Sequence, residues 1–217
     1  MANILGVSGS LRSDSLSRRA LLMGLEFARV RGAEIRLLDL ADVALPMFRP
    51  DDRPSQVVQS VAAEVAWADA FLLASPEYHG AMSGAIKNFL DFHWDELAGK
   101  VFGCLCASHG EGQGAMDQMH IAIRQCHGWS LPYGVSVRDD DFDRTGSLKN
   151  PRVAARLEML GRDVNVYGAL IRSQFQVDLR DGRPDTFASR YGPAATRIDL
   201  AVPAQRLPPP RQALRNS

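Results

Sequence analysis

The feature that most constrains the fold of this chain is a regular alternation between short apolar runs and segments of helical periodicity. The apolar runs have the length of buried strands, and they comprise residues 4–7, 35–38, 70–74, 100–107 and 135–137. After each run, apolar residues recur every three to four positions, which is the spacing of an amphipathic helix. Five strand–helix units in succession predict an α/β fold with a parallel sheet and helices on both faces.

The expected helices each carry an apolar stripe that would face the sheet. The stripes are formed by Leu16, Ala20, Leu21, Gly24, Leu25 and Ala28; by Val57, Val61 and Val65; by Ile86, Phe89, Leu90, Trp94 and Leu97; by Met119, Ile123 and Cys126; and by Val153, Leu157, Leu160, Val164 and Ile171. The last helix has its own start signal, because Asn150 can cap it and Pro151 fits its first turn. Pro76 is expected to end the third strand, since proline cannot donate to a sheet ladder.

Open parallel sheets commonly take one of two strand orders, the dinucleotide-binding order or the flavodoxin-like order 2-1-3-4-5. In both, ligands bind beyond the carboxyl ends of the strands, so we look for function in the loops that follow them. Residues 1–172 are assigned to this domain. Beyond it we interpret residues 174–179 as one more strand and residues 203–217 as a Pro-rich, basic tail. Residues 173–217 are therefore expected to form a C-terminal extension and not a second domain.

The composition narrows the class of protein. The 217 residues include 25 Lys and Arg against 25 Asp and Glu, so the chain lacks the basic excess typical of nucleic-acid binders. No apolar stretch reaches the roughly 18 residues of a membrane-spanning helix, and the N-terminus does not resemble a signal peptide. The three cysteines are odd in number and have no framework spacing, which favours a reducing, cytoplasmic environment.

Two of the cysteines, Cys104 and Cys106, stand two positions apart in the fourth apolar run. Free cysteines usually behave as small buried hydrophobes. No His or Cys partner stands at the spacing of a zinc site, so we expect two core residues and no metal.

The loop after the first strand is rich in hydroxyl groups and leads directly into a helix. Residues 9–17 place four serines around Arg12. These serines are Ser10, Ser13, Ser15 and Ser17. Helix N-terminal amides, hydroxyls and one guanidinium suit a terminal phosphate. The loop has neither the G-x-G-x-x-G pattern of dinucleotide-binding proteins nor the Gly-Lys-Ser/Thr triplet of a P-loop; the alternative is a serine-rich turn with an ordinary helix cap.

The loop after the third strand, residues 75–84, carries planar side chains and two glycines. Tyr78 and His79 offer flat groups against which a ring can rest, and the glycines allow the backbone to approach a ligand closely. Glu77 and His79 could form an acid–base pair, but no nucleophile stands nearby, so we assign no catalytic side chain. A tight turn is the alternative.

The loop after the fourth strand, residues 108–114, has glycine at every second position from Gly110 to Gly114. Its amides are suited to ring carbonyls or to an anion. In the flavodoxin-like order the first strand lies between the second and third, so the loops after strands one, three and four share one rim. A phosphate end, a ring-edge binder and a glycine-rich wall on one rim describe an FMN site.

These loops resemble those of the NADPH-dependent FMN reductases, a family of flavodoxin-like three-layer sandwiches with a five-stranded sheet of order 2-1-3-4-5. The resemblance is carried by residues 9–12 with Ser15, by residues 76–91, which are the most specific, and by residues 146–162. Residues 45–48 are also similar to the family. The resemblance covers roughly residues 1–171.

The resemblance implies bound FMN and a homodimer or homotetramer with the flavin near the subunit interface. It implies that the phosphate is held by Ser10, Arg12, Ser15, Leu16 and Ser17. It implies that the isoalloxazine lies along Pro76, Glu77, Tyr78, His79 and Gly80, near Ser108, Gly110, Gly112 and Gly114. Two positions depart from the family pattern: Ser17 stands where many members have Asn, and Gln113 separates two glycines that are often adjacent.

The activity implied is hydride transfer from NADPH or NADH to the flavin, and then electron transfer to a small-molecule acceptor such as a flavin, quinone, metal oxyanion or azo dye. The flavin supplies the chemistry, so neither a catalytic side chain nor a metal is expected. Two alternatives stay open: a flavodoxin-like FMN-binding electron carrier that does not oxidise NAD(P)H itself, and a non-flavin α/β protein whose loops are only turns. The neutral charge disfavours the carrier, because flavodoxin-like carriers are usually acidic.

Overall fold

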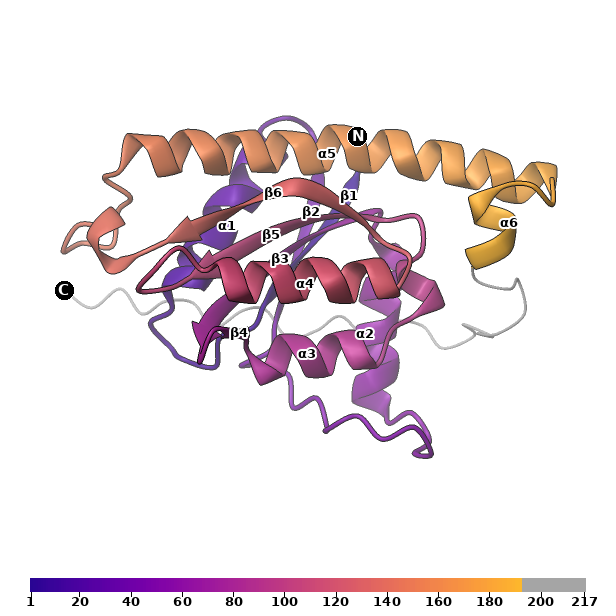
Figure 1. The fold of residues 1–217 in the computed structure, drawn as a ribbon, viewed down its shortest axis with the longest axis horizontal. Helices are drawn as coiled ribbons and strands as arrows, with labels where there is room; N and C mark the ends of the chain where they lie inside the picture. The colour runs from indigo at the N-terminus through magenta and orange to yellow at the C-terminus, as the bar shows by residue number, and fades with distance from the viewer. Residues whose placement is uncertain (193–217) are drawn as a thin grey trace.

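The structure, a computed structural model, describes residues 1–192 (Figure 1). The strands are β1 (Asn3–Ser8), β2 (Glu34–Asp39), β3 (Ala70–Tyr78), β4 (Ala81–Met82), β5 (Val101–Ala107) and β6 (Trp129–Val137). The helices are α1 (Leu16–Arg29), α2 (Gln56–Trp67), α3 (Gly84–Asp91), α4 (Gln113–Gln125), α5 (Pro151–Asp181) and α6 (Phe187–Tyr191), with 3-10 turns η1 (Asp95–Leu97) and η2 (Asp139–Asp141). Strands and helices alternate as the hydrophobic pattern predicts.

Five of the strands form a parallel sheet in the order β2-β1-β3-β5-β6. The short strand β4 lies off this path and pairs antiparallel with the end of β3. Apart from this addition, the arrangement is the predicted flavodoxin-like order 2-1-3-4-5.

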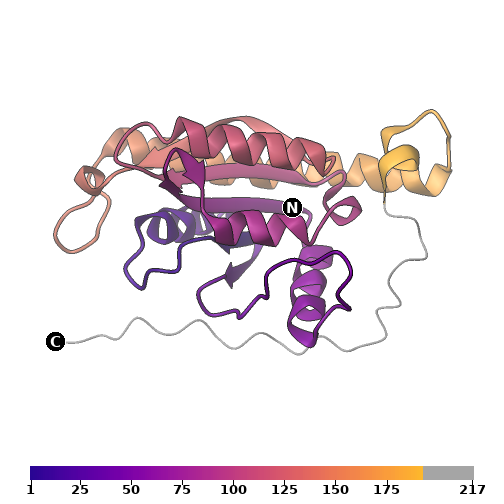
Figure 2. The same ribbon diagram turned by 60° about the horizontal axis from the view of Figure 1, so that its bottom comes forward.

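Helices cover both faces of the sheet, as Figures 1 and 2 show. On one face, α1 and α5 bury a cluster that includes Leu21 and Leu157. On the other, α2, α3 and α4 bury a second cluster that includes Val61, Phe89 and Ile123. Cys104 and Cys106 are fully buried in this second cluster, which confirms them as core residues.

The two helices on the first face cross at a pair of glycines. A Cβ added at Gly161 in α5 would lie 2.5 Å from the carbonyl oxygen of Gly24 in α1. Since that atom is backbone and cannot rotate away, the crossing requires glycine. Asn150 caps α5 as predicted, its side chain accepting a hydrogen bond from the amide of Arg152 at 3.0 Å.

The third strand does not end at Pro76, as the sequence predicted; it continues to Tyr78. The carbonyl of Ala74 accepts from the amide of Gly9, so Ala74 faces β1. Two residues further on, Pro76 faces the same side, but β1 has already ended at Ser8. Proline is tolerated here because its missing amide has no ladder partner to lose.

The third helix is shorter than predicted. Its apolar stripe was expected to include Trp94, but α3 ends at Asp91 and the Trp94 side chain is 62% exposed. The chain tightens after the helix, where the amide of His93 donates to the carbonyl of Leu90. His93 is buried instead, and Leu97 reaches the core from the turn η1.

The strand predicted for residues 174–179 is wrong, because these residues belong to α5. Phe175, Val177 and Leu179 alternate with polar residues and so imitate a strand. Phe175 and Leu179 are also one helical turn apart, and both pack in a small cluster with Ala98 and Ala188 of α6. Burial of that pair favours the helix.

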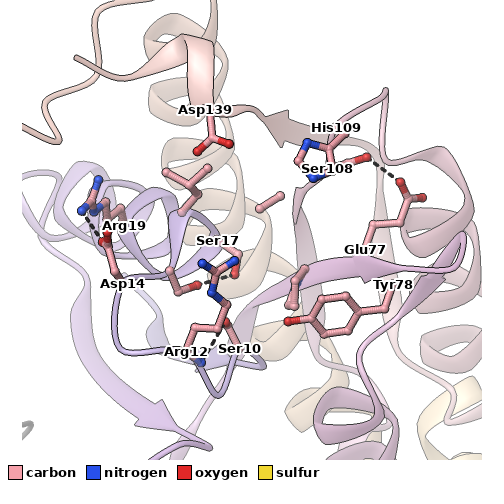
Figure 3. A pocket seen from close by; sticks show the side chains of 14 residues that line it. Ser10, Arg12, Asp14, Ser17, Arg19, Glu77, Tyr78, Ser108, His109 and Asp139 are labelled. Carbon is pink, nitrogen blue, oxygen red and sulfur yellow. Dashed lines mark hydrogen bonds and ion pairs between the residues drawn. The ribbon is translucent and has the colours of Figure 1, made fainter. Parts of the chain in front are cut away.

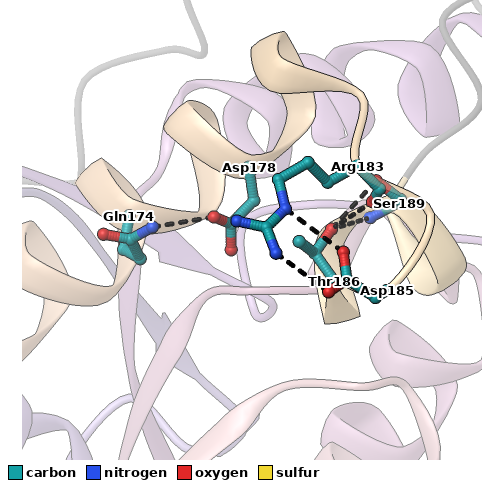
Figure 4. Close-up of polar contacts among 6 residues, drawn as sticks. All are labelled: Gln174, Asp178, Arg183, Asp185, Thr186 and Ser189. Carbon is teal, nitrogen blue, oxygen red and sulfur yellow. Dashed lines mark hydrogen bonds and ion pairs between the residues drawn. The ribbon is translucent and has the colours of Figure 1, made fainter.

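A tight turn then brings α6 back against the end of α5. Gly182 ends α5 with a left-handed φ of 62°. Figure 4 shows the polar contacts that close the turn: Arg183 pairs with Asp185 at 2.9 Å, and Thr186 caps α6 by accepting from the amide of Ser189 at 3.2 Å. The boundary expected between residues 172 and 173 therefore falls inside a continuous helix. The tail expected at 203–217 lies outside the described residues.

Candidate active site

A pocket lies where the carboxyl ends of β1, β3 and β5 meet (Figure 3). Its lining residues come from the segments at the carboxyl ends of four strands. They are Ser10, Arg12, Asp14, Ser15, Leu16, Ser17 and Arg19 after β1; Pro76, Glu77 and Tyr78 at the end of β3; Ala107, Ser108 and His109 at the end of β5; and Asp139 after β6. The loops that the sequence placed on one rim thus contribute to one pocket.

The loop after β1 presents three buried serines at the N-terminus of α1. Ser10, Ser15 and Ser17 are 2%, 6% and 1% exposed. Ser15 caps the helix by accepting from the amide of Arg18 at 3.2 Å, and its Oγ lies 3.0 Å from Oγ of Ser17. The helix dipole and the free amides of the first turn favour an anion at this point.

Two guanidinium groups line the pocket, and they differ in their partners. Arg19 forms an ion pair with Asp14, which neutralises a carboxylate beside the serines. Arg12 is exposed and has no ion-pair partner among residues 1–192. Its charge is therefore the one in the pocket that a ligand can use.

Ser83, which caps α3, joins the loops after β1 and β3. Its Oγ donates to the carbonyl of Gly9 at 2.8 Å and accepts from the amide of Ile86 at 3.3 Å. Its own amide donates to Oγ of Ser75 at 2.8 Å. Ser83 is 3% exposed, so these contacts are shielded from water.

Glu77 joins the end of β3 to the loop after β5. One of its carboxylate oxygens accepts a hydrogen bond from Oγ of Ser108 (Figure 3). The ring of Tyr78, next in sequence, points across the pocket toward Arg12 and Ser10. Tyr78 is 48% exposed, so about half of its surface is open to solvent.

Five of the residues predicted for the site do not line the pocket, namely His79, Gly80, Gly110, Gly112 and Gly114. His79 and Gly80 form the turn from β3 to β4, with left-handed φ values of 54° and 72°. Gly112 is the N-cap of α4, where an added Cβ would lie 2.9 Å from Sγ of Cys106. Burial raises the pKa of this thiol to about 12, so it stays protonated beneath the loop.

Sequence reasoning missed five lining residues: Asp14, Arg19, Ala107, His109 and Asp139. Asp14, Ala107 and His109 are direct neighbours of predicted residues. Asp139 follows β6, the fifth parallel strand. The carboxyl ends of parallel strands lie at one edge of the sheet, so the loop after β6 is also expected to contribute to a site there.

The sequence from residue 2 to residue 142 matches the family model described as NADPH-dependent FMN reductase. The chain belongs to this FMN reductase family. The NADPH-dependent FMN reductase ArsH of Shigella flexneri is 26% identical over 221 residues, which cover 94% of this chain and 84% of that protein. An NAD(P)H-dependent FMN reductase of Pseudomonas aeruginosa is 32% identical over 157 residues, which cover 67% of this chain and 83% of that protein.

Solved structures show the same fold. The flavoenzyme FerB of Paracoccus denitrificans, an NAD(P)H:acceptor oxidoreductase, superposes with a TM-score of 0.66 at 22% identity, covering 80% of this FMN reductase and 98% of that chain. An archaeal flavodoxin superposes with a TM-score of 0.56 at 10% identity, covering 77% of this FMN reductase and 99% of that chain.

As a member of the family, the protein is an NAD(P)H-dependent oxidoreductase that passes electrons from NADPH through FMN to an acceptor. The fold, cofactor and activity inferred from the sequence are thereby confirmed. Within residues 1–192, none of the helices of this FMN reductase has the length and apolar character needed to cross a membrane.

Proposed function

We propose that the pocket binds FMN with its phosphate at the N-terminus of α1, held by Ser10, Arg12, Ser15, Leu16 and Ser17. The donor set supports this assignment. Buried hydroxyls and one guanidinium converge on a helix N-terminus, where the phosphate oxygens can each accept hydrogen bonds. The ion pair between Arg19 and Asp14 adds support, because it reduces repulsion between that carboxylate and the phosphate.

We assign the isoalloxazine to the rim formed by Pro76, Glu77, Tyr78, His79 and Gly80, beside Ser108 and Gly110. A Cβ built at Gly80 would meet no atom within 4 Å, so this turn has an open face against which a ring can lie. Gly112 and Gly114 contribute by giving the loop its path, since both make contacts too close for a side chain.

When bound, FMN supplies the redox chemistry, taking a hydride from NADPH and passing electrons on. The residues of the chain bind and orient it. Arg12 and the amides of α1 fix the phosphate end, while the loop from Ser108 to Gly114 presents backbone amides toward the polar edge of the ring. No side-chain nucleophile is needed.

A planar small molecule is the acceptor that suits this arrangement best, because it can stack on the exposed face of the ring. Relatives named as an NADPH azoreductase and an NAD(P)H:quinone oxidoreductase support a quinone or an azo compound. They are 34% and 31% identical over 119 and 127 residues.

We also propose a cytoplasmic homo-oligomer, a homodimer or homotetramer, in which residues 173–217 form a C-terminal extension of the domain. Three free, buried cysteines support a reducing compartment. An apolar groove between α3 and α4, next to the exposed Trp94 and Ile121, supports association between subunits.

The decisive experiment is the visible spectrum of the purified protein, followed by anaerobic titration with NADPH and NADH. We expect a flavin spectrum that NADPH bleaches and that a quinone restores. A flavin that binds but is not bleached by either nucleotide would identify an electron carrier. A protein that takes up no FMN would refute the assigned pocket.

A further inference from the structure

The carboxylate of Glu77 contacts both ends of the loop between β5 and α4. At the start of the loop, Oε2 accepts from Oγ of Ser108, and that hydroxyl oxygen accepts from the amide of Gly110 at 2.9 Å. Just past its far end, in the first turn of α4, Oε1 accepts from the amide of Ala115 at 3.4 Å. One side chain at the end of β3 therefore bridges the segment whose amides were assigned to the flavin ring.

The first turn of α4 has no cap of its own. Its N-cap residue is Gly112, which has a φ of 67° and no side chain to accept from the helix amides. A carboxylate near a helix N-terminus is favourable both as an acceptor and through the helix dipole. Glu77, near the end of β3, supplies this carboxylate. The position of the first turn of α4 therefore depends on β3.

The turn after β3 and the start of α4 also make a close backbone contact. A Cβ added at Gly114 would lie 2.2 Å from the carbonyl oxygen of Gly80 and 3.5 Å from Oε1 of Glu77. The start of α4 thus lies directly on the turn after β3. The position of the loop after β5 is therefore restricted in two ways. Its end packs against the backbone of Gly80, and Glu77 forms hydrogen bonds on both sides of it.

We propose that Glu77 is a positioning residue, which sets the loop from Ser108 to Gly114 for the flavin ring through hydrogen bonds to Ser108 and Ala115. The inference rests on the proposed FMN site and assigns Glu77 a role that does not require contact with the cofactor. It depends on the length of the side chain and on its two hydrogen-bonding positions, more than on its charge.

Three substitutions of Glu77 distinguish the effect of side-chain length from the effect of its negative charge. Glu77→Gln keeps the length: its oxygen can accept from Ala115, and its amide nitrogen can donate to Ser108. Glu77→Asp keeps the charge but is one methylene shorter, so it cannot bridge both partners. Glu77→Ala has neither. Asp117→Asn is the matched control, because it removes one charge from an exposed side chain of α4, where Asp117 accepts a hydrogen bond from Gln113.

The measurement is FMN affinity by fluorescence titration of the apoprotein, together with the visible spectrum of the bound flavin. We expect near wild-type affinity for the Glu77→Gln and Asp117→Asn variants, and about tenfold or greater weakening for the Glu77→Asp and Glu77→Ala variants, as for loss of one or two hydrogen bonds. In those two, the flavin spectrum should move toward that of free FMN.

An Asp variant that binds FMN as well as or better than the Gln variant would overturn the proposal in favour of a charge effect. Equal affinity in all three Glu77 variants would overturn it as well. If the wild-type protein itself takes up no FMN, the proposed flavin site fails, which is a different result. Circular dichroism and thermal unfolding establish that each variant is folded.

Discussion

The loops after β1 and β5 line the same pocket, but they are held in place by different kinds of contact. In the first, Ser15 accepts from the amide of Arg18, and Ser10 accepts from the amide of Arg12 at 3.4 Å. In the second, the partner is Glu77, which lies 31 positions from Ser108 in the sequence. The serines of the first loop bond to neighbours along the chain, and only Gly9 at its start bonds to the distant Ser83. The second loop is held by Glu77, on a strand that folding brings beside it.

The strongest test of this difference is Gly114→Ala. The added methyl group would meet the carbonyl oxygen of Gly80, which cannot move without shifting the turn after β3. Overpacking of this kind costs about 1–3 kcal/mol of folding stability. If the shifted loop must return to its strained position to bind FMN, affinity should fall by up to roughly 100-fold. The control is Gly84→Ala, where an added Cβ meets nothing within 4 Å. Equal affinities in the two variants, measured by titration, would contradict the tight packing of the two loops.

Arg12→Ala tests the loop after β1 by itself. Loss of the guanidinium should weaken FMN binding by about tenfold or more, as expected for a charge-assisted hydrogen bond. Riboflavin, which lacks the phosphate, should bind equally well to the variant and to the wild type. Comparing the two ligands by fluorescence titration separates the phosphate end from the ring. A parallel loss for riboflavin would place Arg12 elsewhere than on the phosphate.

Ser83→Ala removes the contact between the loops after β1 and β3. It deletes a helix cap and leaves the buried carbonyl of Gly9 without its donor. We expect a loss of about 1–2 kcal/mol in the free energy of unfolding, with FMN affinity lowered several-fold. The matched control is Ser55→Ala, which removes the cap of α2 away from the pocket. Denaturant unfolding should show a loss in both variants, but only the Ser83 variant should bind FMN more weakly.

The smallest effect on the pocket is expected from His93, which does not line it. Burial, assisted by the nearby Lys100, lowers the pKa of His93 from 6.5 to about 4. The unfolded chain therefore binds the proton more readily, so stability is present above pH 6.5 and is lost as the pH falls toward 4. The difference amounts to at most about 3 kcal/mol. His93→Leu should flatten the stability–pH curve in this range while FMN affinity at neutral pH is unchanged; an equally steep curve would refute the assignment.

The same distinction between short-range and long-range contacts decides which parts of the molecule were predictable. The strand–helix alternation, the cap at Asn150 and the serines before α1 depend on residues close in sequence, and all were found. The alternation in residues 174–179 predicts a strand, whereas packing against Ala98 and Ala188 favours the observed helix. Pro76 predicts a strand end because the sequence does not show that β1 stops at Ser8 and leaves this side of β3 without a ladder partner.

By itself, then, the sequence determined the α/β class, the strand order through its family resemblance, and a serine-rich loop whose hydroxyls cap the helix that follows it. The tertiary structure alone decided that Glu77 reaches Ser108 and the start of α4, that Gly114 lies against Gly80, and that Asp139 joins the rim. The physical reason is that a hydrogen bond within a turn is set by local backbone geometry. A bond between two strands exists only after the sheet has placed their ends side by side.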